Sequence, residues 1–412
     1  MNKGKDFKPH IGIFGRRNKG KSSFINTLTG QDVAIVSELA GTTTDPVKKS
    51  YEIFGIGPVI LVDTAGTDDE GEVGLMRVKK SLDMLALMDC AVLLIADNEW
   101  GQAERDLLAA FGKWEVPYLI VHNKSDLCPL NDETRRFIRE ESGQDVIPFS
   151  SVGEYKQDAL IEALIKAIPE TAYTQQSIFD GLIKAKDLVV LVTPVDSEAP
   201  EGRMILPQVM AIRHALDQHC ICVVLRETEL DDFITNTSIR PALVVTDSQA
   251  FAFVSKIIPA DIPLTGFSVL FARMKGHFDR FVDGTPALDR LRDGDRVLIM
   301  ESCSHRVSCE DIGRYKLPDW ILKHSGRKLE FEIVSGIDEA ALPVQQYAIV
   351  IQCGGCVFTR KQVMNRLRPA IEAGVPVSNY GMAIAWMHGI FQRAVESLKP
   401  KQDEKLPFIS FK

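Results

Sequence analysis

The segment GRRNKGKS (residues 15–22) decides the fold of the first part of the chain. It follows the apolar run HIGIF (residues 10–14) and leads into a helical pattern that begins SFINTL. A glycine-rich loop between a strand and a helix is typical of a P-loop, because glycines let successive backbone N–H groups wrap around phosphate oxygens. We therefore expect Lys21 to reach the β- and γ-phosphates of a nucleotide and Ser22 to bind Mg²⁺.

A second motif supports the nucleotide site. The apolar run PVILV (residues 58–62) ends in the sequence DTAG, which begins at Asp63. This order places the Asp63 carboxylate at the carboxyl end of a strand beside the P-loop, where it contacts the Mg²⁺ shell. Gly66 is then positioned to donate its backbone N–H to the γ-phosphate.

Two more strand ends select the base. The run VPYLIVH (residues 116–122) leads into NKSD, and the run DVIPFS ends at Ser150, which Ser151 follows. The Asp126 carboxylate can accept two N–H bonds from guanine, and adenine has no such pair of donors on that edge. Asn123 bonds the base edge, Lys124 covers its face, and the backbone after the third strand reaches guanine O6. The predicted GTP-binding residues are Gly15, Asn18, Lys19, Gly20, Lys21, Ser22, Ser23, Asp63, Gly66, Asn123, Lys124, Asp126, Ser150 and Ser151.

This first part resembles the Era and MnmE branch of the translation-factor-class GTPases. The resemblance lies in GTTTD (residues 41–45), which matches switch I, and in Asn18 within the P-loop. It implies that Thr43 binds Mg²⁺ and that Asn18 helps to hold a K⁺ ion, which neutralises charge in the transition state. The predicted catalytic residues are thus Lys21, Thr43 and Asn18. Thr67 stands where Ras-like enzymes carry a glutamine, so we expect slow, K⁺-stimulated GTP hydrolysis.

The whole chain has 412 residues, 45% hydrophobic residues and a formal net charge of −8. At about 100–200 residues per domain, this length predicts several domains. The acidic balance disfavours a general nucleic-acid binder, which needs a basic face. No apolar run approaches the roughly 18 residues of a membrane span. We expect a cytoplasmic protein without membrane partners, whose eight cysteines form no disulfide framework.

The remaining sequence alternates strand-like and helical runs. DLVVLVTP, CICVVLRE and PALVVTDS are separated by helical patterns, which predicts a parallel sheet in the middle of the chain. Cys220 and Cys222 lie on one of these strands and are interpreted as packing residues rather than metal ligands. The predicted fold class is α/β with three domains, a doubly wound P-loop GTPase followed by two smaller domains with mainly parallel sheets.

The last third carries two cysteine motifs at strand ends. The run VLIM leads to Cys303 and His305, and the run YAIVI leads to the CGGC segment that contains Cys353 and Cys356. If both strands belong to one parallel sheet, these side chains meet at its carboxyl edge. An iron–sulfur cluster, a zinc site that includes His305, a redox dithiol and unliganded thiols all remain open from the residues alone.

Over essentially its full length, the chain resembles the [FeFe]-hydrogenase maturation GTPase family, HydF. The family signature is CxH followed by HCxxC, and Gln352 stands where the second histidine is often found. The resemblance implies a [4Fe-4S] cluster held by Cys303, Cys353 and Cys356, with an exchangeable fourth position for which His305 is a candidate. It further implies a homodimer that receives a transient di-iron precursor from two radical-SAM maturases and delivers it to apo-[FeFe]-hydrogenase.

The expected domains are a GTPase domain (1–170), a dimerisation domain (171–264) and an iron–sulfur cluster-binding domain (265–412). Two other functions compete with this prediction. One is an RNA-modification or ribosome-assembly GTPase of the Era or MnmE type with a structural zinc site. The other is a redox sensor in which the cysteines control the GTPase.

Overall fold

A computed structural model gives the architecture. It describes residues 8–30, 47–53, 55–68, 71–152, 157–169, 172, 177–194, 204–302, 311–336, 338–356 and 358–398. The chain divides into two compact units, Met1–Gln175 and Gln176–Lys412. No helix in these described ranges has both the length and the apolar composition that a membrane span requires.

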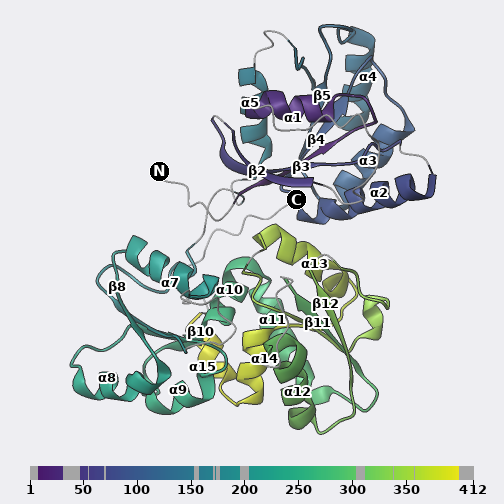
Figure 1. Ribbon diagram of the computed structural model, residues 1–412. Coiled ribbons are helices and arrows are strands. Elements are labelled where there is room, and N and C mark those ends of the chain that lie inside the picture. Colours follow the sequence, from purple (N-terminus) through teal and green to yellow (C-terminus); the bar gives the residue numbers. More distant parts are fainter. Residues whose placement is uncertain are drawn as a thin grey trace. The chain divides into compact units, whose positions relative to one another are not determined.

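The first unit is built on a six-stranded sheet in the order β2-β3-β1-β4-β5-β6 (Figure 1). The strands are β1 (His10–Phe14), β2 (Val47–Ile53), β3 (Gly57–Asp63), β4 (Cys90–Ile95), β5 (Tyr118–His122) and β6 (Val146–Pro148). The helices are α1 (Lys21–Thr29), α2 (Gly71–Asp83), α3 (Gln102–Lys113), α4 (Asp132–Ser142) and α5 (Gln157–Ala167). Only β2 among these strands runs antiparallel to its neighbour, and the other pairs are parallel.

The central strand β4 shows why this sheet carries helices on both faces. All of its side chains are buried, and successive side chains in a strand point to opposite faces. Val92 packs in the cluster that includes Phe24 of α1 and Leu160 of α5. Leu93 packs in the opposite cluster, together with Phe111 of α3. The first unit is therefore doubly wound, as the sequence predicts.

The second unit contains two four-stranded sheets whose strands are all parallel, in the orders β10-β9-β7-β8 and β12-β11-β13-β14. The strands are β7 (Leu188–Val192), β8 (Ile221–Leu225), β9 (Leu243–Thr246), β10 (Leu264–Gly266), β11 (Arg296–Glu301), β12 (Glu330–Ser335), β13 (Ile349–Gln352) and β14 (Val377–Asn379). The helices are α7 (Leu206–Asp217), α8 (Leu230–Asn236), α9 (Phe251–Ile257), α10 (Phe267–Lys275), α11 (Phe278–Gly284), α12 (Leu317–Ser325), α13 (Arg360–Glu372), α14 (Tyr380–Met387) and α15 (Phe391–Glu396). These two sheets and the GTPase sheet confirm the predicted fold class.

Both small sheets place their first strand in the interior, with the second strand on one side and the third on the other. The chain therefore changes direction across the sheet at β7/β9 and again at β11/β13. Such a switch point opens a crevice outside the carboxyl ends of the two strands, where α/β proteins bind ligands. β10 (Leu264–Gly266) pairs with β9, so the expected domain boundary between residues 264 and 265 falls inside a strand of the middle sheet.

Helix α10 connects the two sheets of the second unit. It begins directly after β10 and contacts α7 on one side and α13 and α14 on the other. The carboxyl-terminal helix α15 returns to the middle sheet, where Thr265 donates a hydrogen bond of 2.8 Å to the carbonyl of Ala394. The end of α10 lies close to the last sheet, because Lys275 at this end donates a hydrogen bond to the Gly355 carbonyl in the loop after β13.

Candidate functional site

The P-loop joins β1 to α1 and has the backbone that phosphate binding requires. Gly20 precedes α1 with φ of 84°, and a Cβ at this position would lie 2.5 Å from the Asn123 side-chain nitrogen. A residue other than glycine would therefore be both strained and obstructed here. Lys21 Nζ donates to the carbonyls of Gly15 and Arg16 at 3.0 and 2.9 Å, which holds the ammonium over the loop.

The Mg²⁺ side of the site is assembled from α1 and the end of β3. Ser22 Oγ donates to Asp63 Oδ2 at 3.3 Å, so the predicted hydroxyl ligand lies next to the carboxylate predicted to contact the Mg²⁺ shell. Gly66 packs closely against the P-loop, and a Cβ there would lie 2.9 Å from the backbone nitrogen of Arg17. The same Arg17 N–H donates to the Asp68 carboxylate at 2.6 Å. The segment after β3 thus contacts the P-loop directly.

The end of β5 is fixed to the P-loop through two side chains. Asn123 is fully buried and donates from Nδ2 to the Lys19 carbonyl at 2.9 Å. Lys124 Nζ donates to the Asn18 carbonyl at 2.7 Å. Asn18 itself is exposed and adopts φ of 58°. These bonds place the base-recognising motif and the phosphate loop at one end of the sheet.

Asp126 and the two serines after β6 complete the predicted base pocket. Ser150 Oγ donates to Asp126 Oδ1 at 2.5 Å, and Ser151 Oγ donates to Asn123 Oδ1 at 3.3 Å. The structure therefore brings together the predicted residues from the P-loop, β3, β5 and β6. Ser23 lies exposed in the first turn of α1, and its role in GTP binding stays a prediction.

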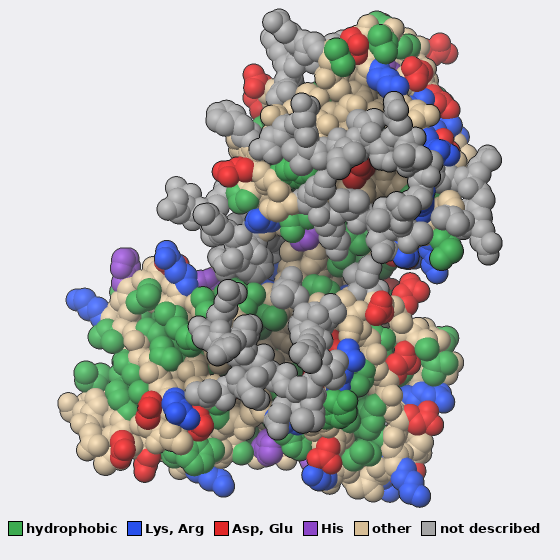
Figure 2. Space-filling view, in the orientation of Figure 1, with side chains coloured by type: hydrophobic (Ala, Val, Ile, Leu, Met, Phe, Trp, Pro, Cys, Tyr) green, Lys and Arg blue, Asp and Glu red, His purple; other side chains and the backbone are tan. Residues whose placement is uncertain are grey.

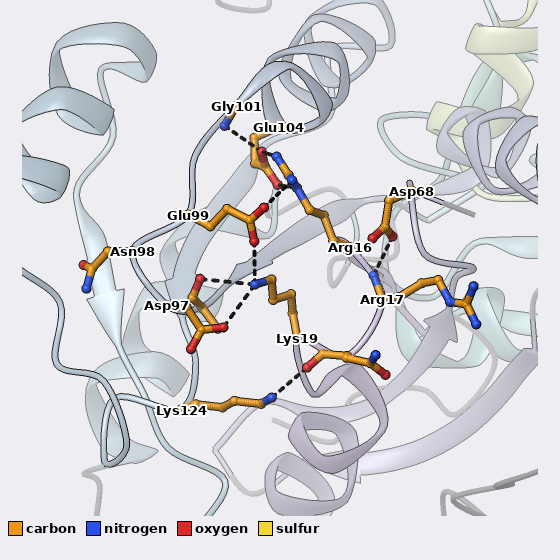
Figure 3. A network of polar contacts seen from close by, with 12 residues as sticks. Arg16, Arg17, Lys19, Asp68, Asp97, Asn98, Glu99, Gly101, Glu104 and Lys124 are labelled. Carbon is orange, nitrogen blue, oxygen red and sulfur yellow. Dashed lines mark hydrogen bonds and ion pairs between the residues drawn. The ribbon is translucent and has the colours of Figure 1, made fainter. Parts of the chain in front are cut away.

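A network of charged side chains joins the P-loop to the segment after β4, and no sequence motif predicted it (Figure 3). Arg16 donates to Glu104 from Nε at 2.8 Å and from Nη2 at 2.7 Å, and it also pairs with Glu99. Lys19 Nζ pairs with Asp97 at 3.1 Å and with Glu99 at 2.6 Å. The Lys19 ammonium is thus held by the loop after β4, and the Lys19 carbonyl accepts the bond from Asn123 of the base motif. The sequence offered one sign of this network, because Arg16 and Lys19 are basic residues at P-loop positions that the motif leaves open.

Cys353, one of the predicted cluster cysteines, lies at the switch point of the last sheet. β11 and β13 are parallel neighbours with Met300 opposite Gln352, and the Cys353 N–H donates to the Met300 carbonyl at 2.9 Å. Cys353 Sγ accepts the Ser302 N–H at 3.2 Å and lies 3.0 Å from Ser302 Oγ. Gln352 Nε2 lies 3.4 Å from the same sulfur. The expectation that both strands belong to one parallel sheet is confirmed.

A buried ammonium and a partly buried guanidinium lie near Cys353 and Cys356. Lys275 is 2% exposed, and its Nζ donates to the carbonyls of Gly355, Cys356 and Phe358. Burial lowers the pKa of Lys275 to about 8, while negative charge on the two cysteines favours the protonated amine. Burial also lowers the pKa of Arg366, and negative charge on Cys353 opposes this effect. The site is therefore suited to a negatively charged ligand set.

A buried carboxylate fixes the end of β11. Glu301 is 3% exposed and accepts a hydrogen bond from Arg314 Nη2 at 3.0 Å and from Ser335 Oγ at 2.8 Å. Arg366 Nη1 donates to the Glu301 carbonyl at 2.8 Å. Hydrogen bonds thus hold both the side chain and the backbone carbonyl of Glu301, which fixes the last residue of β11 in place.

Three predicted ligands lie outside the described residues, namely Thr43, Cys303 and His305. Within the described part of the chain, no group of three or more His, Cys, Asp or Glu side chains forms a metal site. Cys353 and Cys356 are described and partly exposed. The structure thus places two of the three predicted cluster cysteines.

Comparison with protein-family models divides the chain into three consecutive segments. Residues 10–124 match a 50S ribosome-binding GTPase model. Residues 178–276 match the hydrogen maturase F dimerization domain, and residues 279–397 match the hydrogen maturase F tetramerization domain. The last two segments together cover more than half of the chain.

Curated relatives and solved structures resemble part of the chain. The tRNA modification GTPase MnmE of Laribacter hongkongensis is 34% identical over 165 residues, which is 39% of this chain and 34% of the relative. MnmE of Lactobacillus helveticus is 40% identical over 158 residues, covering 37% of this chain and 33% of the relative. The chain thus spans about a third of the length of these relatives. Era of Aquifex aeolicus has 18% identity and a TM-score of 0.36, covering 53% of this chain and 93% of Era.

Proposed function

Because the chain belongs to the hydrogen maturase F family, we propose that it is a GTP-hydrolysing scaffold that carries an iron–sulfur cluster and delivers a di-iron precursor to apo-[FeFe]-hydrogenase. The observation that supports this most strongly is the parallel pairing of β11 with β13. It brings Ser302, the residue before Cys303, next to Cys353 at a switch point where α/β proteins bind ligands.

The described residues fit a cluster. Thiolates are the usual protein ligands of [4Fe-4S] clusters, and hydrogen bonds to sulfur help to set the reduction potential. Cys353 Sγ already lies within reach of Ser302 and Gln352. We propose Cys303, Cys353 and Cys356 as the ligands and His305 as a candidate for the fourth position. A cluster with three cysteine ligands supplies one iron at which a metal fragment can attach and leave.

In the first unit we propose GTP as substrate, with Mg²⁺ bound by Ser22 and Thr43. Lys21 neutralises charge on the β- and γ-phosphates, and Asn18 helps to hold a K⁺ ion there. Hydrolysis is proposed to be slow and to be stimulated by K⁺. Release of the phosphate-bound segments on hydrolysis would change how the second unit meets its partners. Those partners are apo-[FeFe]-hydrogenase and two radical-SAM maturases.

The chain carries a dimerization domain and a tetramerization domain, so it is built for self-association. We propose that the edge strand β8 forms the dimer contact. Ile221 and Val224 of β8 are 53% and 40% exposed, and Val209 and Leu216 of the neighbouring α7 are 47% and 55% exposed. Figure 2 shows hydrophobic side chains gathered over this part of the surface. An unpaired apolar edge strand is a template for pairing with a second copy.

The test is an anaerobic analysis of iron, sulfide and zinc with EPR of the dithionite-reduced protein. Wild type is compared with the triple variant Cys303→Ala, Cys353→Ala, Cys356→Ala, and with Cys128→Ala as a control for a cysteine in the first unit. About four irons and a [4Fe-4S]⁺ signal that only the triple variant loses would support the proposal. About one zinc and no iron after reconstitution would refute it and favour an RNA-linked GTPase.

A further inference from the structure

Lys275 is the last residue of helix α10, and its side chain extends into the loop that follows β13. Its side chain is 2% exposed, although it carries an ammonium group. An ammonium buried without partners costs several kcal/mol, so such a group must be fully hydrogen-bonded to persist in a fold. Lys275 Nζ donates to the carbonyls of Gly355, Cys356 and Phe358 at 2.8, 3.0 and 2.8 Å.

An ammonium has three N–H donors, and these three bonds match them in number. These three acceptors belong to Gly355, Cys356 and Phe358, so the carbonyls of one short loop converge on the ammonium. Gly355 allows this bend because it adopts φ of +66°, and a Cβ there would lie 2.8 Å from Val363 Cγ2. The Phe358 N–H closes the turn with a bond of 3.1 Å to the Gly355 carbonyl. Lys275 therefore fixes the backbone that carries Cys356.

The lysine and the loop come from different segments of the chain. Lys275 lies in the segment that matches the dimerization domain, whereas Cys353 and Cys356 lie in the segment that matches the tetramerization domain. Helix α10 packs against α7 of the first segment and against α13 and α14 of the second. The shape of the cysteine loop thus depends on contacts across this division.

We propose that Lys275 is a positioning residue for the cluster loop, and that its positive charge stabilises the anionic, thiolate-ligated cluster. This inference rests on the proposed cluster-binding function. The ammonium holds the loop in one shape before metal is bound, which lowers the ordering cost of ligation. It also favours the reduced, more negatively charged state of the cluster, because opposite charges attract strongly where water is excluded.

The experiment compares the full-length wild type with Lys275→Met, Lys275→Arg and the control Arg273→Met. Arg273 lies two residues earlier on α10 and interacts electrostatically with Asp180. Lys275→Met keeps an unbranched side chain but has neither charge nor donors. Lys275→Arg keeps the charge, although a planar guanidinium does not reproduce three convergent bonds.

The first measurement is hydrogen–deuterium exchange of the metal-free proteins. We expect the peptide that contains residues 353–358 to exchange at least about tenfold faster in both Lys275 variants, as expected for the loss of one or two hydrogen bonds. Peptides from β1 should be unchanged, and Arg273→Met should match wild type in the loop. Wild-type protection of the loop in both Lys275 variants would overturn the positioning role.

The second measurement is the midpoint potential and iron content after reconstitution. Lys275→Met should lose iron to a chelator faster than wild type and have a more negative potential, while Lys275→Arg should keep a potential near that of wild type. Equal potentials in wild type and Lys275→Met would refute the charge effect. If wild type itself takes up no iron, the proposed cluster function fails, and the exchange measurement still decides whether Lys275 positions the loop.

Discussion

Replacing Glu104 with glutamine should loosen the P-loop while preserving the volume of the side chain. Glu104 lies in the first turn of α3, and its side chain is 3% exposed. It accepts two bonds from Arg16 of the P-loop at 2.8 and 2.7 Å and one from the Gly101 N–H at 2.8 Å. The variant loses the charge that makes the two Arg16 bonds strong and turns one acceptor oxygen into a donor.

The expected magnitude follows from these contacts. A hydrogen bond to a charged group contributes about 1.5–3 kcal/mol, and removing one partner of a fully buried ion pair costs about 3–5 kcal/mol. The upper range does not apply, because the Arg16 side chain is 21% exposed and keeps Glu99 as a partner. We expect the free energy of unfolding of the first unit to fall by about 2 kcal/mol, which is roughly 30-fold in the unfolding equilibrium constant.

Native-state hydrogen–deuterium exchange of the full chain measures this change, with peptides from β1 and β4 as reporters of the first unit. Titration with a fluorescent GTP analogue should show weaker binding, because Arg16 directly follows the first P-loop glycine. Asp106→Asn is the control, since Asp106 is exposed on the same helix and bonds Gln102 at 2.8 Å. If Glu104→Gln matches Asp106→Asn in both assays, the network does not support the P-loop and the reasoning is wrong.

Three further predictions concern self-association, pH and the monovalent cation. Ile221→Lys should convert the dimer to monomer in sedimentation experiments. The control Ile239→Lys, at a 57% exposed position outside the sheet, should leave the dimer intact. A dimer that persists in Ile221→Lys would exclude β8 as the contact. His122 Nε2 accepts the Asn98 N–H at 3.2 Å, and burial lowers the pKa of His122. As pH falls, the unfolded chain therefore takes up a proton on this histidine before the folded chain does, and the first unit should lose stability below about pH 6.5. A free energy of unfolding that does not vary with pH in this range would contradict this prediction. Na⁺ in place of K⁺ should slow GTP hydrolysis in wild type but not in Asn18→Ala, and equal wild-type rates would exclude a K⁺ role.

The nucleotide site was predictable because each of its motifs is contiguous and directly follows an apolar strand. The parallel order of those strands then brings their ends together, so Ser22 meets Asp63 although 41 positions separate them. The adjacency of the two cysteine motifs was inferred in the same way, and the pairing of β11 with β13 confirms the strand arrangement.

Residues that reach the site from a neighbouring helix belong to no contiguous motif, so the sequence did not predict their contacts. Lys275 lies 80 positions from Gly355, at the end of a helix where a basic residue is already expected to interact with the helix dipole. Arg366 is part of an ordinary amphipathic helix, yet its Nη1 reaches the Glu301 carbonyl. Such contacts depend on how α10 and α13 pack, which periodicity and motif spacing do not specify.

The second unit has two closely spaced cysteine pairs, Cys220 with Cys222 and Cys353 with Cys356. They differ in the end of the strand at which they lie, and this difference separates a packing role from a predicted ligand role better than their spacing does. Cys220 and Cys222 lie at the start of β8, at the edge of the sheet opposite to its switch point. Burial raises the pKa of both thiols, which keeps them protonated and unreactive. Cys353 instead follows the carboxyl end of β13 and accepts hydrogen bonds there. The same strand order therefore leaves β8 as an apolar edge strand in one sheet and places Cys353 after the central strand β13 in the other. Helix α10 contacts helices that follow strands of both sheets, and Lys275 at its end bonds the loop after β13.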